Sequence, residues 1–336
     1  MEKQRITYID VAKGILILFV VYGHIYGHAK YLNFASVDWI RQSCNFFIPF
    51  YMPCFFVITG FCSSFKKPFL KFIWQSFKSI ILPGITLSLM LIVMGLNAST
   101  IMDLAKEIIL YGGQYWFLTS LFLARIIYWL ISKYLKKSCL KTIACVLSFI
   151  LGFVVSLIYN GREFWWFVHS LLLLPYLGFG QLLKNYELRY IKMYSLVYGI
   201  TFILTALLSH YGILRIDFYY HEPGISQDLL NVNLSMLVSL IVLSLFGSLF
   251  VLGISKVINS SGILEYLGKN SLVIYCVHGA ILGVVLHKID EFLLSIDSEF
   301  SCVLSILIAY IITVVFSCTI AFVLNKKYLK ALIGKF

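Results

Sequence analysis

Apolar runs of about 20 residues follow one another along almost the whole chain, and short polar breaks separate them. Because a helix of about 20 apolar residues crosses the ~30 Å hydrocarbon core of a bilayer, each run predicts one membrane-spanning helix. The runs lie near residues 14–32, 44–64, 79–97, 113–132, 142–159, 164–183, 193–210, 230–254, 271–289 and 301–324. The pattern predicts an all-α, polytopic integral membrane bundle of about ten transmembrane helices, with residues 1–336 as a single domain.

Composition agrees with this pattern, since 60% of the residues are hydrophobic and only 12% are charged. A soluble domain carries roughly a quarter charged residues, so a water-facing globular domain is excluded. The basic start and first apolar run lack the small-x-small cleavage site of a signal peptide, and we expect this run to stay as a span. Most of the eight cysteines fall inside apolar runs without metal-ligand spacing, as small buried hydrophobes do.

The net charge of +12 is distributed unevenly about the predicted spans. Twenty of the 27 Lys and Arg residues fall on one face of this threading and six on the other, while Arg125 lies within a span. Because basic loops of membrane proteins stay in the cytoplasm, both termini are expected to be cytoplasmic. The excess positive charge is therefore a topology signal and does not indicate nucleic-acid binding.

Ionisable residues inside a bilayer are costly and commonly functional, and four lie inside predicted spans: His24, Arg125, His169 and His278. Lys13 and His24 are eleven positions apart, which is about 20° beyond three full turns and ~16 Å along the axis, so they share one helix face. His278 follows Lys269 by nine residues and Arg125 precedes Lys133 by eight, so both lie ~12–13 Å deep. Three basic groups on three helices are thus expected at similar depth, with His169 nearer the outer surface.

Two interpretations of these groups stay open from the residues alone. Neutral histidine is an effective general base near pH 7, which favours a catalytic role. Alternatively, a buried histidine or arginine only bonds a neighbouring carbonyl. His24 and His28 also have the i, i+4 spacing of a metal pair, but no HExxH motif or partner carboxylate accompanies them, so we expect no metal site.

The second apolar run contains Pro49 and Pro53, four residues apart. Each proline removes a backbone donor, so we expect a break or kink in this helix. Irregular backbone at membrane depth occurs only where protein or a cavity covers it. The prolines therefore indicate either a cavity beside the first span or a structural kink.

Four motifs, in order along the chain, carry a resemblance to a known family. They are RITYIDVAKGILILFVVYGH (5–24), with a basic residue, ten residues and a histidine from Lys13 to His24, MPCFFVITGF (52–61), YWFLTSLF (115–122) and LGKNSLVIYCVH (267–278). Together they resemble the membrane acyltransferase-3 family over essentially the whole chain. The variant with Tyr8-Ile9-Asp10 is similar to the fucose 4-O-acetylase-like branch.

This resemblance implies a multi-pass protein of the bacterial cytoplasmic membrane that O-acetylates a cell-surface glycan. Cytoplasmic acetyl-CoA would be the donor substrate, with no bound cofactor. His24 matches the essential histidine, Lys13 its paired basic residue, and His278 the late motif. Supporting polar positions are Asp10, Trp116, Arg125, Asn270 and Ser271.

Donor binding is the place where the chain departs from the family pattern. Many members have an RxxR-type element before the proline that opens the third span, whereas KFIWQSFKSIILP stands here before Pro83. Lysine keeps the positive charge but loses the bidentate guanidinium fork. The donor-phosphate hypothesis therefore falls on Lys66, Lys67, Lys71 and Lys78, which positive-inside topology alone would also explain.

Several mechanisms and functions fit these residues. Either His24 acts as general base on the acceptor hydroxyl, or it carries the acetyl group in a covalent relay; Arg125, His278 or Asn270 would stabilise the oxyanion. The acceptor would be a capsule, O-antigen, exopolysaccharide or lipid-linked sugar. The alternatives are a transporter or flippase of a glycan or lipid-linked sugar, and a structural subunit of a glycan-assembly complex. The two matching halves with broken helices that are common in transporters are not recognisable.

Overall fold

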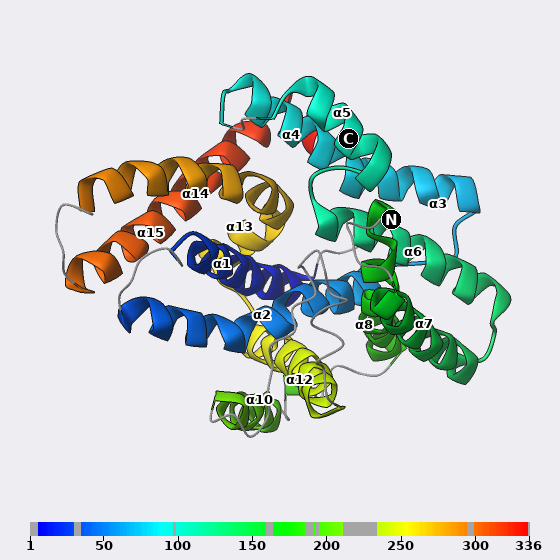
Figure 1. Cartoon of the computed structure of the whole chain (residues 1–336). Coiled ribbons are helices and arrows are strands. Elements are labelled where there is room, and N and C mark those ends of the chain that lie inside the picture. Colours follow the sequence, from blue (N-terminus) through cyan, green and yellow to red (C-terminus); the bar gives the residue numbers. More distant parts are fainter. Residues whose placement is uncertain are drawn as a thin grey trace. The chain divides into compact units, whose positions relative to one another are not determined.

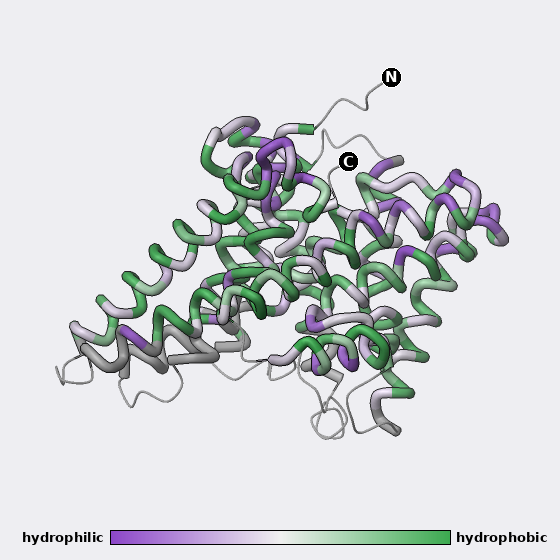
Figure 2. The backbone as a smooth tube through the Cα atoms, turned by 90° about the horizontal axis from the view of Figure 1, so that it is seen from above, coloured by the Kyte–Doolittle hydropathy of each residue, from purple (hydrophilic) through white to green (hydrophobic). Residues whose placement is uncertain are grey.

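The computed structural model describes residues 6–29, 35–96, 99–158, 164–185, 191–192, 195–210, 234–293 and 299–334. Every regular element within these ranges is helical (Figure 1), and each predicted apolar run contains a helix. Figure 2 shows hydrophobic residues along most of the length of these helices. The prediction of an all-α membrane protein is confirmed.

The chain divides into two compact units, which are described separately. The first unit comprises Met1–Ile48, Thr86–Ile101 and Ile258–Phe336, and the second comprises Pro49–Ile85 and Met102–Val257. The first contains α1 (Thr7–Ala29), the start of α2 (Ala35–Cys62), the end of α4 (Leu82–Val93), α13 (Gly262–Lys269), α14 (Ser271–Leu293), α15 (Glu299–Leu324) and the 3-10 helix η3 (Lys330–Ile333). The second contains the rest of α2 and α4, α3 (Phe69–Ser76), the π-helix η1 (Phe77–Ile81), α5 (Ile101–Tyr111), α6 (Trp116–Tyr134), α7 (Ser138–Ile158), the 3-10 helix η2 (Phe164–Trp166), α8 (Phe167–Asn185), α10 (Ser195–His210) and α12 (Leu234–Ile258).

The number of spans can be compared with the ten predicted. By length and composition, seven described helical segments are able to cross a membrane, or eight if the bent pair α13–α14 forms one span. Two further predicted spans correspond to the shorter apolar helices Phe47–Cys62 and Ser195–Thr205. A multi-pass membrane protein is therefore established, while ten spans, a single domain and cytoplasmic termini stay predictions.

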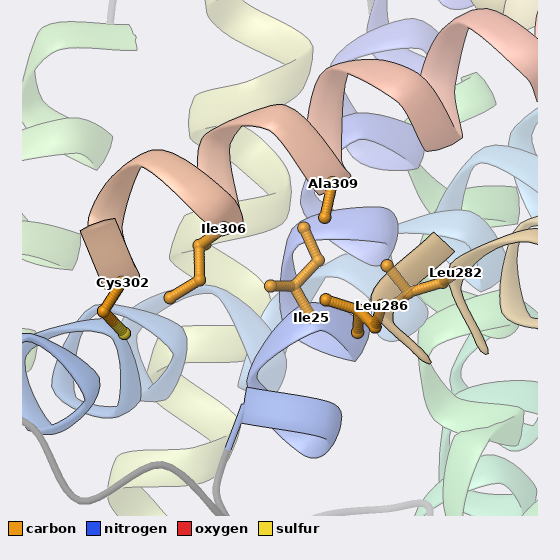
Figure 3. Packing of buried hydrophobic residues seen from close by; sticks show 6 residues of the cluster. All are labelled: Ile25, Leu282, Leu286, Cys302, Ile306 and Ala309. Atoms are coloured by element: carbon orange, nitrogen blue, oxygen red, sulfur yellow. The ribbon is translucent and has the colours of Figure 1, made fainter. Parts of the chain in front are cut away.

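A buried cluster joins α1, α14 and α15 in the first unit. Ile25 of α1 points between Leu282 of α14 and Ile306 of α15 (Figure 3), and neither Ile25 nor Leu282 is exposed. Lipid tails are as apolar as these side chains, so close packing rather than removal of water favours the contact. The cluster fixes α1 next to the two C-terminal helices.

The second run is expected to break or kink at its prolines, and it does not break, because α2 remains helical through Pro49 and Pro53. A proline at position 53 cannot donate to the Pro49 carbonyl one turn earlier. The buried Ser244 hydroxyl of α12 donates to that carbonyl instead, at 2.7 Å. The orphaned backbone group is thereby satisfied by a neighbouring helix, which is how transmembrane helices tolerate proline.

The same device occurs a second time in α8. Pro175 cannot donate to the Leu171 carbonyl four residues earlier, and the buried Ser148 hydroxyl of α7 lies 3.2 Å from that oxygen. Ser148 also lies 2.7 Å from its own helix's Cys145 carbonyl, so its single hydrogen serves two acceptors. Serine on the adjacent helix thus accompanies proline at both places.

Glycine allows the second half of α2 to approach α8 at backbone distance. A Cβ atom on Gly60 would lie 2.0 Å from the Leu177 oxygen, and one on Gly180 would lie 2.0 Å from the Val57 oxygen. Beyond this crossing, Gln181 and Lys184 donate to the Ser63 carbonyl at 3.1 and 2.7 Å. The end of α2 is therefore capped by side chains of α8.

Candidate functional site: a histidine pair in the first unit

The first span is held against α13 by two glycines, one on each helix. A Cβ on Gly14 of α1 would lie 2.1 Å from the Leu264 oxygen, and one on Gly268 of α13 would lie 1.8 Å from the Asp10 oxygen. Only residues without a side chain permit so close a backbone approach. Figure 1 shows α13 lying beside α1. This crossing fixes the start of α1. His24 lies further along the same helix, near its end.

A sharp bend between α13 and α14 positions the second histidine. The two helices meet at 80°, and Asn270 stands at the corner. Its side-chain amide donates to the Tyr266 oxygen at 2.8 Å, while its Oδ1 accepts a 2.7 Å hydrogen bond from Asn325 at the end of α15. Ser271, the first residue of α14, is half-buried. One end of the Asn270 amide thus bonds back to α13, and the other end ties the bend to the residue that follows α15.

His24 and His278 lie in direct ring contact, with centroids 4.7 Å apart and planes at 78°. His278 is 3% exposed and His24 is half-buried. Tyr275 lies one turn before His278, with ring centroids 6.0 Å apart. The similar depth expected for these two histidines is thus matched by contact between α1 and α14.

The hydrogen bonds of the pair define its tautomers. His24 Nδ1 lies 2.9 Å from the Val20 oxygen, and His278 Nδ1 lies 3.0 Å from the Ile274 oxygen. A backbone carbonyl only accepts hydrogen bonds, so Nδ1 carries the proton in each ring. The basic lone pair of each neutral imidazole is therefore on Nε2.

The other predicted residues of the first unit lie on α1 itself. Asp10 is 3% exposed, and its backbone oxygen is the atom that a Cβ on Gly268 would meet. Lys13 is half-buried and precedes Gly14, the other glycine of the crossing. Lys13 and His24 both lie on α1, with the α13 crossing at the beginning of this helix and the imidazole contact near its end, while their pairing stays a prediction.

Arg125 belongs to the second unit, on α6. Its guanidinium lies over the Phe72 ring at 5.4 Å, and its buried Nε has no hydrogen-bond partner among the described residues. A cation over an aromatic face gains electrostatic attraction without using its N–H donors. Arg125 thus keeps a donor available, while its convergence with the two histidines stays a prediction.

The four candidate donor-binding lysines lie in one stretch of the second unit. Lys66, Lys67 and Lys71 are exposed, and Lys67 donates to Gln75. Lys78 is half-buried, with its ammonium 4.9 Å from the Trp74 ring centroid. Lys78 is also part of the π-helical turn η1, and such turns occur frequently at functional sites. The lysines are therefore accessible, and an aromatic surface accompanies one of them.

Trp116 begins α6 and contacts a buried histidine of the same unit. Its ring centroid lies 5.5 Å from that of His169, and Trp166 lies 5.1 Å from His169 on another side. Trp165 and Trp166 have positive φ angles of 53° and 52°, which are unusual for bulky residues. The contribution of Trp166 is not evident from the sequence, where it is one of several aromatic residues in an apolar run.

Within the described ranges, no group of three or more His, Cys, Asp or Glu side chains lies close enough together to hold a metal ion. The His28 side chain, the second member of the possible metal pair, lies outside the described residues. His24 instead contacts His278. Asn325 is the clearest position that sequence reasoning misses, because a polar residue at the end of a last span is ordinary without its partner in view.

Fold and site together define a multi-pass helical membrane protein with a pair of contacting imidazoles from two helices. A family model described as an acyltransferase domain matches residues 6–325. The chain belongs to this acyltransferase-3 family, and the resemblance of its four motifs is confirmed.

The nodulation protein NolL of Mesorhizobium japonicum is similar to part of the chain. The two are 31% identical over 131 residues, which cover 35% of this chain and 34% of the relative. The match thus spans about a third of that protein. No solved structure matches the chain.

Proposed function

We propose that this protein is an O-acetyltransferase of the bacterial cytoplasmic membrane, which transfers an acetyl group from cytoplasmic acetyl-CoA to a hydroxyl of a cell-surface or cell-envelope glycan. Family membership supports acyl transfer over transport or flipping of a glycan. The observation that carries the site assignment is the contact between His24 and His278, with the proton of each ring on Nδ1.

His24 is the general base in this proposal. Its Nε2 accepts the proton of the acceptor hydroxyl while the hydroxyl oxygen attacks the thioester carbonyl carbon. The tetrahedral intermediate then expels the CoA thiolate, which takes the proton back from the His24 imidazolium. General-base catalysis of this kind contributes typically about 10²–10⁴-fold to a rate.

His278 keeps His24 in its productive state. A neutral neighbour tolerates the transient positive charge on His24, whereas a second cation would oppose it. The Nδ1 bond from His24 to Val20 also fixes the ring so that Nε2 is the reactive nitrogen. Lys13, on the same helix face, is the proposed basic partner of His24, with Asp10 supporting it.

The remaining polar residues divide into binding and positioning roles. Lys66, Lys67, Lys71 and Lys78 are the proposed ligands of the donor phosphates. Arg125, with a buried N–H donor, is the proposed oxyanion ligand. Asn270, with Ser271, is proposed to position the bend that carries His278, because both ends of its amide are already hydrogen-bonded.

Membranes containing the protein, incubated with labelled acetyl-CoA, test this function. Label should enter a glycan fraction, and NMR of surface glycans should show O-acetyl groups that are lost when the protein is absent. His24→Gln should lower transfer by at least about 10²-fold while the protein stays membrane-inserted and monodisperse in detergent. Unchanged transfer would refute the assignment of His24, and label trapped on the protein without acceptor would indicate the acetyl-histidine relay.

A second variant separates the two histidines. His278→Gln should retain part of the activity, because His24 keeps its own Nδ1 bond to Val20. A loss equal to that of His24→Gln would give His278 a direct part in the chemistry. A glycan that remains unacetylated with the unaltered protein would contradict the proposed function as a whole.

A further inference from the structure

The second unit contains a cavity of about 480 Å³ between α6, α7, α8 and α12. This volume is within the usual range of about 300–1,000 Å³ for ligand pockets. In Figure 1 the adjacent helices α7 and α8 are drawn in green. No residue proposed for acetyl transfer lines this cavity.

Two chemical environments meet in the lining. Lys136 and Lys141 stand at the polar end, where Ser138 begins α7. The opposite part of the wall is apolar and includes Phe149 of α7 and Leu245 of α12. A cavity with ammonium groups at one end and hydrocarbon along its length is complementary to an anionic amphiphile.

One side of the cavity is continuous with the apolar surface of α7. Val146 lines the cavity and is 49% exposed, and its neighbours Ile143, Leu147 and Ile150 are exposed to similar degrees. In a span, an exposed apolar face of this kind meets lipid. A ligand that enters from the bilayer therefore reaches the cavity without crossing water.

The inner wall of the cavity is rigidly built. A Cβ on Gly178 would lie 2.7 Å from the Cys145 sulfur, so α7 and α8 are in close contact there. Gln181, another lining residue, donates to the backbone oxygens of Gly60 and Ser63. The cavity is thus bounded by side chains that the fold holds in place.

We propose that this cavity binds an anionic phospholipid of the surrounding membrane, with the head group at Lys136 and Lys141 and one acyl chain along α7 and α12. Basic pockets between transmembrane helices recognise anionic head groups, because each lysine near the membrane surface attracts them. This site is independent of acetyl transfer, and it would bind a specific class of lipid to the second unit.

Native mass spectrometry of the full-length protein tests this site, after incubation with equal amounts of phosphatidylglycerol and phosphatidylcholine of the same chain length. The unaltered protein should retain phosphatidylglycerol preferentially. Lys136→Gln with Lys141→Gln should weaken that retention ~10-fold. Lys327→Gln with Lys330→Gln removes the same charge from exposed positions outside the cavity and should leave retention unchanged.

A second pair of variants tests the acyl chain. Val146→Trp fills the cavity from its lipid-facing side and should reduce phosphatidylglycerol retention several-fold. Leu147→Trp adds the same ring at the next residue, outside the lining, and serves as its control. Both positions are exposed, so neither substitution disturbs the buried packing of α7.

Three results would overturn the proposal. Equal retention of the two lipids by the unaltered protein would show that the anionic head group is not recognised. Unchanged retention in the Lys136→Gln, Lys141→Gln variant would remove the cavity as its location. Displacement of phosphatidylglycerol by palmitoyl-CoA at equal concentration would identify an acyl thioester, and not a phospholipid, as the occupant.

Discussion

The pairing of Pro53 with Ser244 makes a quantitative prediction about how this membrane protein tolerates proline. Ser244→Ala removes the hydroxyl that donates to the Pro49 oxygen at 2.7 Å. In the natural sequence the Pro49 carbonyl then loses a donor that Pro53 cannot replace. If Pro53 is first changed to alanine, the new backbone N–H is placed to donate to Pro49, and the hydroxyl becomes dispensable.

The magnitude follows from burial and from the cost of losing a hydrogen-bond donor. Ser244 is fully buried, and leaving a buried acceptor unsatisfied costs about 1–3 kcal/mol. Hydrogen bonds between transmembrane helices average about 0.6 kcal/mol and reach about 1.7 kcal/mol. We therefore expect Ser244→Ala to cost about 1–2 kcal/mol when Pro53 is present and under about 0.5 kcal/mol in the Pro53→Ala background.

Reversible unfolding in mixed micelles, followed by circular dichroism, measures the four proteins of this double-mutant cycle. The coupling free energy between the two sites should be about 1 kcal/mol. Ser248→Ala is the matched control. The Ser248 hydroxyl is equally buried, but it donates to the backbone oxygen of Ser244 in its own helix, at 2.6 Å. An equal cost of Ser244→Ala in the presence and absence of the proline would refute the reasoning.

Three further perturbations test the packing described above. Ser148→Ala should destabilise the protein by about 1 kcal/mol in chemical unfolding, and Pro175→Ala should reduce that cost, as in the first cycle. Gly268→Ala places a methyl group 1.8 Å from a backbone oxygen and should cost about 2 kcal/mol or more, whereas Gly279→Ala on α14 meets open space and should be neutral or stabilising; equal thermal shifts would contradict the close crossing. Asn325→Asp should lower the melting temperature more than Asn325→Ala, because it sets a carboxylate against the Asn270 oxygen; the reverse order would contradict the bond assigned here.

The apolar periodicity of the sequence predicts the helices well, since membrane spans are long and their boundaries are marked by charge. The sequence also predicts that His24 and His278 lie at similar depth, because the axial rise along a helix is regular. The sequence pattern does not predict as well which helices pack against each other. That α1 packs on α13 depends on Gly14 and Gly268, and glycine is common in spans whether or not another backbone approaches.

The prolines show most clearly why sequence reasoning is incomplete. Pro53 removes a donor, and from the second span alone a break or kink is the reasonable expectation. The hydroxyl that replaces the missing hydrogen bond belongs to Ser244, far away along the chain, and the sequence around Pro53 does not predict this contact. The interhelical bond between Asn270 and Asn325 is inaccessible to the sequence for the same reason.

The contacts around the histidine pair explain how a helical bundle can hold two imidazoles in a fixed relation. At the start of α1, the Gly14–Gly268 crossing leaves no space for movement toward α13. At the far end, Ile25, next to His24 in the sequence, is buried against Leu282, one turn beyond His278. The pair therefore lies between two fixed contacts of α1, in the place where each ring makes its own Nδ1 bond. General-base chemistry requires such preorganisation, because a base that samples many orientations loses the benefit of proximity.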